Sequence, residues 1–341
     1  MTLPSLSVIV PNFNHAHFIG EALEAILEQS LKPHELIVVD DASTDDSLEV
    51  LDALRGKNPA IRLVRNEKNL GVVESVNRQA RLASGAYVYF AAADDKILPG
   101  FFERSIGLLS RHPQAGLCST RSLLLGEHGE TLGPYRMPVV AKTERYLPPR
   151  RIASIYKKFG DWVAPNTAIF RREAFLEFGG LDPALGGSSD GFLHHAISLK
   201  YGACYIPEPL AMWRQLETSY AATYTTDVRA AIGLVERLEH RMRDKHGDLF
   251  PPGYAELFKL RALRSVVYGL SRRDPYRHDL ILEVGQAMRF RGPLDRIYFA
   301  GLRLYLEAGR WATKLYILLQ HPLPDQLRII LKKLRRLASK A

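Results

Sequence analysis

Short apolar runs alternate with segments of helical period over the first hundred residues of the chain. The apolar runs are rich in β-branched residues and predict buried strands, and the segments between them predict amphipathic helices. The expected strands are residues 8–10, 36–39, 61–64 and 87–92, and the expected helices are residues 20–30, 46–54 and 72–83. Ser43 or Thr44 is expected to cap the second helix, and Gly85 to end the third. This βαβαβαβ order requires right-handed crossovers and predicts an α/β fold with a mostly parallel sheet flanked by helices.

The pattern loosens after Pro99, and strand signals stop after about residue 226. The segment from Gly126 to Pro149 holds several Gly and Pro residues without a clear period and predicts a loop. Helices are expected at residues 100–111, 171–178 and 190–201, and strands at residues 115–119, 168–170 and 204–206. The expected domains are residues 1–224, with halves at about 1–100 and 101–224, and a helical, basic region at residues 225–341.

The composition fits a globular protein of a reducing compartment. With 341 residues, of which 46% are hydrophobic and 24% charged, the chain can form two domains with buried cores. Two cysteines, Cys118 and Cys204, are too few for a disulfide framework and are expected to be small core residues. The first ten residues lack the pattern of a secretory signal, and no window reaches the roughly 18 apolar residues of a membrane span. We therefore expect a cytoplasmic protein.

Positive charge gathers at the C-terminal end of the chain. The formal net charge is +9, and residues 321–341 contain six Lys or Arg against one acid, Asp325. Apolar side chains recur there at helical spacing, at Leu327, Ile330, Leu331, Leu334 and Leu337. This pattern predicts an amphipathic basic helix on an anionic membrane surface, at the inner face of the cell membrane. The alternative is a helix that packs on its own domain or on a second copy in a homo-oligomer. Nucleic acid is not an expected partner, because aromatic residues do not interleave with the basic ones.

Polar side chains follow three of the predicted strands at the point where each strand ends. Asn12 follows the first strand, Asp41 the second, and Asp94 and Asp95 the fourth. Because the carboxyl ends of parallel strands share one edge of a sheet, these groups are expected along a single ligand crevice. Carboxylates at such an edge can hold a divalent cation against phosphate groups. The sequence therefore predicts a nucleotide site.

Four segments in this order and spacing resemble the inverting family-2 glycosyltransferases, in particular the SpsA-like, non-processive members with a GT-A fold. The segments are Val8-Ile9-Val10-Pro11-Asn12-Phe13-Asn14, Val38-Val39-Asp40-Asp41-Ala42-Ser43-Thr44-Asp45, Asn69-Leu70-Gly71 with Asn77, and Ala93-Asp94-Asp95 with Pro99. The resemblance covers residues 5–220. It implies a GT-A, Rossmann-like fold and transfer of a sugar from a nucleotide-diphosphate donor, expected to be a UDP-sugar. The acceptor is expected to be a hydroxyl of a glycan or lipid-linked molecule in surface polysaccharide synthesis. The Gln-x-x-Arg-Trp segment of processive members is absent, so we expect limited additions.

The resemblance also implies which residues bind the donor. Asp41 is expected to accept the N–H of the base, and Asp94, with Asp95 beside it, to hold Mn²⁺ or Mg²⁺ on the diphosphate. The whole donor set is Pro11, Asn12, Phe13, Asn14, Asp41, Gly71, Asn77, Asp94 and Arg214. Ala92 stands where the Asp-x-Asp segment of the family has its first acid. The alternatives are a helix cap for Asp41 and its neighbours, an acidic turn for Asp94, and surface ion pairs for Arg214.

The acceptor side is expected to contain the catalytic base. Residues 186–193 resemble the Gly-Glu-Asp-x-x-Leu segment of the family, which aligns Asp190 with the base and puts Ser189 in place of the Glu. A single carboxylate within hydrogen-bond reach can take the proton of the attacking hydroxyl during direct displacement. Trp162 and Asn166 are expected to line the acceptor pocket. The alternative for Asp190 is a helix cap.

Two other classes of function remain open at this point. A nucleotidyltransferase would need a Gly-rich loop with a following Lys or Arg after the first strand, and the chain has Asn12-Phe13-Asn14-His15 instead. A non-catalytic module that binds nucleotide sugars or glycans is the second alternative, and Ala92 and Ser189 favour it. The histidine pairs, His15 with His17 and His194 with His195, lack the companions of a zinc site and are expected to be ordinary surface or core residues.

Overall fold

The computed structural model describes residues 3–216, 227–273, 283–284 and 287. The chain divides into two compact units, one of residues 1–220 and 240–255, and one of residues 221–239 and 256–341. The sheet and all candidate site residues belong to the first unit. Because each unit is compact by itself, we describe them separately.

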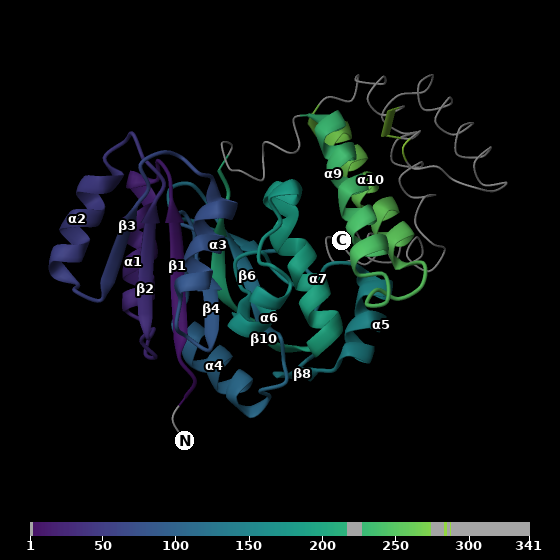
Figure 1. Cartoon of the computed structure of the whole chain (residues 1–341), viewed down its shortest axis with the longest axis horizontal. Helices are drawn as coiled ribbons and strands as arrows, with labels where there is room; N and C mark the ends of the chain where they lie inside the picture. Colours follow the sequence, from purple (N-terminus) through teal and green to yellow (C-terminus); the bar gives the residue numbers. More distant parts are fainter. Residues whose placement is uncertain (1–2, 217–226, 274–282, 285–286, 288–341) are drawn as a thin grey trace, which may run out of the picture. The chain divides into compact units, whose positions relative to one another are not determined.

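The N-terminal half of the first unit alternates strands and helices, as the apolar pattern predicts (Figure 1). In chain order the elements are β1 (Leu6–Asn12), α1 (Ala16–Leu27), β2 (Glu35–Asp40), α2 (Ser47–Lys57), β3 (Ile61–Arg65), α3 (Val72–Leu82) and β4 (Tyr87–Phe90). The four strands are parallel, in the order β3-β2-β1-β4. The α/β expectation is therefore confirmed for this half.

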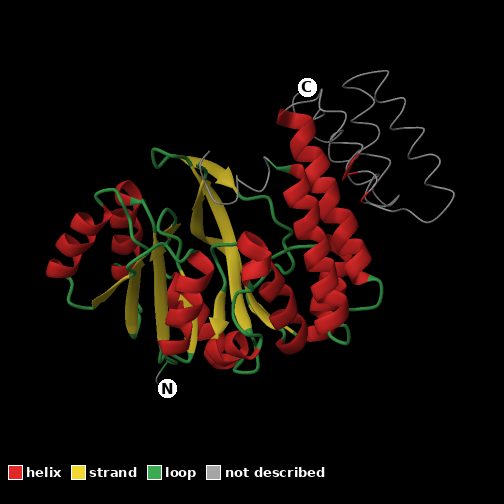
Figure 2. Cartoon of the chain, turned by 45° about the horizontal axis from the view of Figure 1, so that its top comes forward, coloured by secondary structure: helices red, strands yellow, loops and turns green. Residues whose placement is uncertain are grey.

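Side chains alternate between the two faces of the sheet and build two apolar layers. Val8 and Val10 of β1 pack with Ile19 of α1 in one buried cluster. On the opposite face, the ring of Phe90 lies 5.9 Å from that of Phe170, and further rings join this layer. This two-faced burial explains why the strands are nearly continuous apolar runs. Figure 2 shows the helices packed around the strands.

The expected helix ends were wrong in two places. Neither Ser43 nor Thr44 caps α2, because α2 begins at Ser47 and Asp46 occupies the N-cap position without a side-chain cap bond. The hydroxyl of Ser43 bonds to Asp40 instead. Gly85 lies beyond the end of α3. A Cβ at Gly85 would lie 2.5 Å from the hydroxyl oxygen of Ser7, so close packing explains this glycine better than a helix end does.

The second half of the first unit extends the same sheet with mixed strand directions. Its elements are β5 (Lys96–Ile97), α4 (Phe101–Arg111), β6 (Leu117–Leu125), β7 (Thr131–Pro134), β8 (Arg145–Leu147), α5 (Pro149–Phe159), β9 (Ile169–Arg171), α6 (Arg172–Glu177), the 3₁₀ helix η1 (Pro183–Ser188), α7 (Ser189–Tyr201) and β10 (Ala203–Arg214). Strand β9 runs antiparallel to β4 and β6, and β6 runs parallel to β10. Within the described residues the strands form one ten-stranded sheet.

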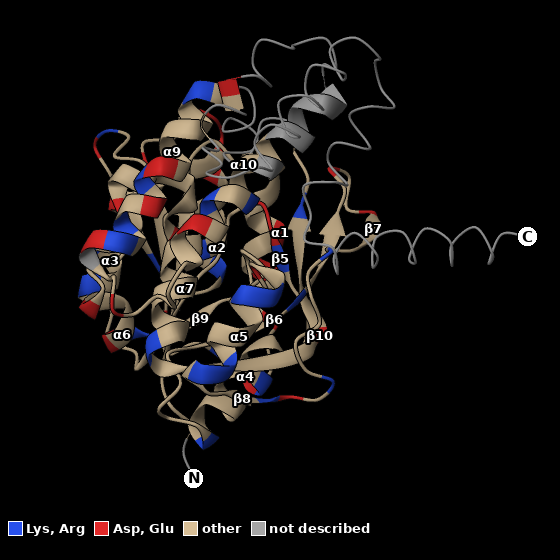
Figure 3. Ribbon diagram, turned by 90° about the vertical axis from the view of Figure 1, so that its right-hand side faces the viewer, with Lys and Arg blue, Asp and Glu red and all other residues tan. Residues whose placement is uncertain are grey.

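The segment from Gly126 to Pro149 was expected to be a loop, but it also contains two strands. It contains β7, which pairs with β6, and β8, which pairs with β10, both antiparallel. Each strand is short, and its Gly and Pro residues hide the period of two on which strand prediction depends. The same region leads into α5, whose exposed side is basic, with Arg150, Arg151, Lys157 and Lys158 (Figure 3).

The region after residue 226 is helical where the structure describes it. It contains α9 (Val228–His240), the π-helix η2 (Arg241–Lys245) and α10 (Tyr254–Arg273). Lys259 of α10 forms ion pairs with Glu236 and Glu239 of α9. Among the described helices, none combines the length and the apolar character that a membrane span requires. The predicted boundary near residue 224 and the predicted membrane helix at 321–341 lie outside the described residues and stay predictions.

Candidate active site

The loops that follow β1 and β2 are locked together by hydrogen bonds. The Asn12 amide donates to Asp40 at 3.0 Å and to the Ser43 hydroxyl at 3.2 Å. The Asn14 side-chain oxygen accepts from the Thr44 backbone N–H at 2.7 Å. Asn12 is buried and shapes the turn through its Nδ2, while its side-chain oxygen has no hydrogen-bond partner among the described residues.

Two residues of these loops have left-handed backbones, and one neighbouring ring is exposed. Asn14 has φ 57° and Ala42 has φ 62°. Ala42 is strained in this region, because only glycine and, less readily, asparagine adopt it at low cost. Phe13 is 41% exposed and is the apolar side chain that the first loop presents to solvent next to the partly exposed Pro11. A planar base could pack on such a ring.

Asp41 fastens the loop before α3 to the end of β2. Its carboxylate accepts from the backbone N–H of Leu70 at 2.9 Å and of Gly71 at 2.8 Å. The Asn66 amide at 2.7 Å and the Ser75 hydroxyl at 3.2 Å also donate hydrogen bonds to this carboxylate. Gly71 has φ 82° and ψ 155°, a conformation that is almost restricted to glycine. Asp41 is 4% exposed, so a base could reach only the lone pair that remains on its Oδ2.

Asn77 was expected to bind the donor, but the structure contradicts this. Its amide donates to the carbonyl of Leu181 and accepts from the Leu181 N–H, both at 2.8 Å. A Cβ at Gly180 would lie 2.3 Å from the Asn77 oxygen, so the loop approaches α3 closely. Both polar groups of the buried amide are thus occupied by protein. Asn77 joins the nucleotide half to the segment that leads into α7.

Asp94 and Asp95 differ sharply in environment although they are neighbours. Asp95 is 7% exposed and accepts the backbone N–H of Arg214 at 2.8 Å. Burial, and next the charge of Asp94, raise the pKa of Asp95 well above its ordinary value. Asp94 is partly exposed, and its carboxylate has no hydrogen bond or ion pair with any other described residue. Asp94 is therefore the carboxylate of this turn that is open to a ligand.

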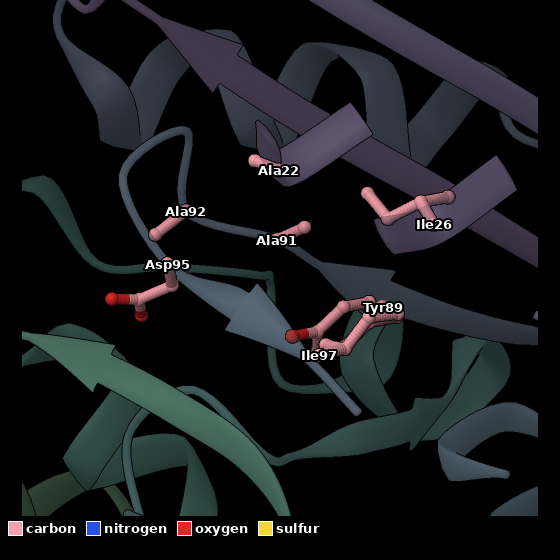
Figure 4. Close-up of a pocket in the computed structure, with 7 residues that line it drawn as sticks. All are labelled: Ala22, Ile26, Tyr89, Ala91, Ala92, Asp95 and Ile97. Carbon is pink, nitrogen blue, oxygen red and sulfur yellow. The ribbon is translucent and has the colours of Figure 1, made fainter. Parts of the chain in front are cut away.

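A small cavity of about 10 Å³ lies behind this turn (Figure 4). Ala92, Asp95 and Tyr89 are among the residues that line it. The Asp95 carboxylate points away from the Tyr89 ring (Figure 4). The volume of this cavity is about that needed for one water molecule, and Ala92 is one of the residues that line it.

Arg214 holds the acidic turn from β10 and is 2% exposed. Its Nε donates to the Asp94 carbonyl at 2.7 Å, and its Nη1 donates to the carbonyls of Gly126 and Glu127, each at 3.0 Å. Its Nη2 bonds to Glu21 of α1. Arg214 thus forms an ion pair with Glu21, as the alternative expected, but the guanidinium is buried and not on the surface. Sequence reasoning missed Glu21, because no motif surrounds it.

Asp190 lies in the first turn of α7 and is partly exposed. Its Oδ1 accepts the N–H of Gly191 at 2.6 Å. Burial, and to a smaller extent the charge of Asp161, raise the pKa of Asp190 to about 6, and the Gly191 N–H opposes this shift. Ser188 occupies the N-cap position of α7, so Asp190 is not the cap. A carboxylate with this pKa is suited to a general base at neutral pH.

The two expected acceptor residues lie in the core. Trp162 is 1% exposed, and its ring packs at 5.8 Å from that of Tyr205. A ligand cannot reach it, so the expectation for Trp162 was wrong. Asn166 is 5% exposed, and its side-chain amide lies close enough to the buried Asp95 to oppose the rise in the pKa of that carboxyl. The backbone carbonyl of Asn166 accepts a hydrogen bond from the Tyr89 hydroxyl at 2.9 Å.

The histidines are distributed without a metal cluster among the described residues. His194 is buried and stacks on Phe170, and burial lowers its pKa to about 3. His195 is also buried and contacts Asp161, an acid that the sequence did not single out. The partly exposed Tyr135, after β7, is a second residue that was missed, since its segment was expected to be an ordinary loop.

Comparison with known proteins identifies the family and the fold. The model of glycosyl transferase family 2 matches residues 7–179. An uncharacterised glycosyltransferase of Haemophilus influenzae is 28% identical over 243 residues, which cover 70% of this chain and 77% of that protein. A crystal structure of S. aureus TarS in complex with UDP-GlcNAc superposes with a TM-score of 0.63 at 17% identity, over 97% of this chain and 92% of that one. The structure of the mannosyltransferase PcManGT from Pyrobaculum calidifontis, in complex with GDP-Man and Mn²⁺, superposes with a TM-score of 0.56 at 22% identity, over 94% of this chain and 86% of that one. The expected GT-A fold is thereby confirmed.

Proposed function

The chain belongs to glycosyltransferase family 2, and from this premise we propose that it transfers a sugar from a UDP-sugar to a hydroxyl of a glycan or lipid-linked acceptor, with inversion at the anomeric carbon. Surface polysaccharide synthesis is the process that we infer for it. The donor class is supported by structural neighbours that bind UDP-GlcNAc, UDP and GDP-Man. UDP is favoured because the structure in complex with UDP-GlcNAc gives the higher TM-score of the two solved structures compared above.

The proposal rests on one observation above all, the open carboxylate of Asp94 on a turn that Arg214 immobilises. Four protein oxygens surround the Arg214 guanidinium, namely those of Asp94, Gly126, Glu127 and Glu21. A buried guanidinium with this many partners has little freedom left to follow a leaving diphosphate. We therefore assign Arg214 to positioning the acidic turn, in place of the direct diphosphate contact expected from the sequence.

The residues of the turn fit a divalent metal. Mg²⁺ and Mn²⁺ prefer oxygen ligands and are often held by one or two carboxylates, with substrate phosphates and water completing the shell. Asp94 would hold the ion, and Asp95 is less suited because its carboxylate is buried against Arg214. When bound, the metal would neutralise charge on the diphosphate as it leaves. The mannosyltransferase complex with Mn²⁺ supports this assignment.

We assign the proton transfer to Asp190. Direct displacement forms a bond between the acceptor oxygen and the anomeric carbon while the bond from that carbon to the diphosphate breaks. The acceptor hydroxyl loses its proton in this step, and the ionised Asp190 carboxylate takes it. With a pKa of about 6, Asp190 is mostly ionised at pH 7 yet basic enough to accept the proton.

The remaining donor residues are proposed to shape the base pocket. Asp41 holds the loop at Gly71, and Phe13 offers an exposed ring at the rim. Asn12 and Asn14 keep this rim in place through their bonds to the opposite loop. The base N–H would meet the free lone pair of Asp41.

We also propose that the protein works at the inner face of the cell membrane. The basic residues of 321–341 and the basic, exposed side of α5 support contact with anionic lipid. Truncation after His321 is expected to weaken binding to anionic liposomes while transfer to a soluble acceptor persists. Equal liposome binding by the truncated and full-length proteins would exclude the anchor.

Hydrolysis of the donor tests the proposed function. UDP-GlcNAc and GDP-Man are incubated with the protein, with Mn²⁺ or with EDTA, and release of the nucleotide diphosphate is measured. We expect Mn²⁺-dependent release that falls at least 100-fold in Asp94→Asn, with the exposed Asp248→Asn as matched control. A protein that binds UDP but releases nothing from any donor would instead be a non-catalytic module.

A further inference from the structure

Asp161 lies in the loop after α5 and reaches solvent from a rigid support. Its side chain is 62% exposed, and its Oδ1 lies 3.1 Å from Nε2 of His195. The His195 side chain is only 2% exposed. Exposed acids of this kind usually pair with mobile surface lysines or arginines, which hold them loosely. Asp161 lies against a buried imidazole instead, with which it forms an ion pair when the ring is protonated.

The support beneath Asp161 is built from α5, α7 and the first residue of α10. Nδ1 of His195 lies 2.8 Å from the carbonyl of Gly191, and its Nε2 lies 2.8 Å from the hydroxyl of Tyr254. The imidazole stacks on the ring of Tyr156, with the ring centroids 4.0 Å apart. Contacts on both edges and one face fix the ring. The Asp161 carboxylate therefore lies against a ring that is anchored to the start of α7.

This arrangement brings Asp161 next to the proposed base. Gly191, whose carbonyl holds His195, directly follows Asp190 and donates its N–H to the Asp190 carboxylate. The charges of Asp161 and Asp190 both act on the hydroxyl of Tyr135, whose pKa is raised first by burial and then by these two acids. Asp161, Asp190 and Tyr135, from three separate segments, thus lie close enough for their charges to interact.

Aromatic surface adjoins the two acids. The rings of Tyr135 and Trp213 meet edge to face, with centroids 5.0 Å apart, and both side chains are partly exposed. Carboxylates that accept hydrogen bonds from hydroxyls, next to aromatic rings that pack on C–H groups, suit a saccharide. Two like charges would repel a phosphate or a carboxylate of the ligand.

We propose that Asp161 is a positioning residue for the acceptor, which accepts a hydrogen bond from a sugar hydroxyl next to the one that Asp190 deprotonates. Tyr135 and Trp213 provide the surface on which this sugar lies. The acceptor sugar at this place is then neutral or cationic and not a uronate or a phosphorylated sugar. This inference rests on the proposed function, because it takes Asp190 as the base.

Kinetics with defined acceptors test the proposal. Octyl glycosides of glucose, galactose, N-acetylglucosamine and glucuronate are supplied with UDP-GlcNAc and Mn²⁺ to wild type, Asp161→Asn, Asp161→Glu and the control Asp248→Asn. In Asp161→Asn we expect the KM for the neutral glycosides to rise about tenfold, while hydrolysis of UDP-GlcNAc in water and the Kd for UDP change less than twofold. Asp161→Glu should recover part of the affinity, since it restores the carboxylate. An unchanged acceptor KM, or better use of the glucuronide than of the neutral glycosides by wild type, would overturn the proposal.

A second measurement does not depend on activity. The carboxyl carbon of Asp190 is followed by ¹³C NMR during a pH titration of wild type and Asp161→Asn, with Asp190→Asn to assign the signal. The charge of Asp161 raises the pKa of Asp190, and Tyr135 stays neutral through this titration because burial raises the pKa of its hydroxyl. Removal of the Asp161 charge should lower the titration midpoint of Asp190 by about half a pH unit or more. If the midpoint stays the same, the two acids are not neighbours and the proposal fails, even if the protein proves to be a glycosyltransferase. If wild type releases no nucleotide but the midpoint moves, the proposed function fails while the pairing of the acids holds.

Discussion

Replacement of the proposed base should stabilise the protein while it sharply lowers turnover. The pKa of Asp190 is raised from 3.8 to about 6, chiefly by burial, so the folded state disfavours its charge. A difference of about two pH units corresponds to about 3 kcal/mol at 1.36 kcal/mol per unit. Because Asp190 is partly exposed, we expect about 1 to 2 kcal/mol of this to appear in the free energy of unfolding.

The size of this difference in the free energy of unfolding depends on pH. Between pH 4 and pH 6 the folded state binds the proton more tightly than the unfolded state does, so stability falls as the pH rises through this window. Above pH 6 the full penalty of the charged carboxylate is present, and below about pH 3.8 it is absent. Asp190→Asn removes the charge and keeps an oxygen for the Gly191 N–H. The variant should therefore gain stability over wild type at pH 8 and lose most of this advantage at pH 4.

Urea unfolding at pH 8 and pH 4 measures the difference, and release of UDP from UDP-GlcNAc measures turnover. We expect a higher urea midpoint for Asp190→Asn at pH 8, together with turnover reduced by roughly 10² to 10⁴ and nearly unchanged binding of UDP. In wild type, turnover should fall as the pH is lowered through about 6, because the base becomes protonated. A variant that is less stable than wild type at pH 8, or equally shifted at both pH values, would refute the burial of a functional charge at this position.

Three further substitutions test the framework of the site. Ala42→Gly should raise the free energy of unfolding by about 0.5 kcal/mol, because glycine relieves the φ of 62° and loses part of this gain to chain entropy, as urea unfolding would measure. Asn77→Ala should lower it by about 2 kcal/mol, since both backbone groups of Leu181 lose their partners, and an unaltered urea midpoint would argue against this clamp. Arg214→Lys keeps the charge but cannot span its separate acceptors, so calorimetric titration should show about tenfold weaker Mn²⁺-dependent binding of UDP, and wild-type affinity would show that Asp94 needs no such support.

Local sequence patterns predict the N-terminal half of the fold and the two partly exposed acids Asp94 and Asp190. Strands β1, β2 and β4 are buried on both faces, so each contains an apolar run that can be recognised in the sequence. Asp94 follows β4, and Asp190 lies in the first turn of α7. The resemblance to the family identified both residues. The short strands β7 and β8 were missed because three or four residues with Gly or Pro carry no readable period.

Contacts between distant residues could not be predicted from local patterns. The amide of Asn77 and the backbone of Leu181 are 104 positions apart, and Arg214 meets Asp95 across 119 positions. Each polar side chain in these pairs would look equally suited to a ligand when only the sequence is known. Trp162 was placed in the acceptor pocket because of the family resemblance of its segment, although the fold buries it.

The most direct test of the metal and donor site is a crystal grown with UDP and Mn²⁺ and measured for anomalous scattering. We predict a single manganese peak about 2 Å from the Asp94 carboxylate, bridging it to the phosphates of UDP, with Arg214 still bound to the turn. A manganese peak away from Asp94, or UDP bound at full occupancy without metal in this crevice, would contradict the proposed site.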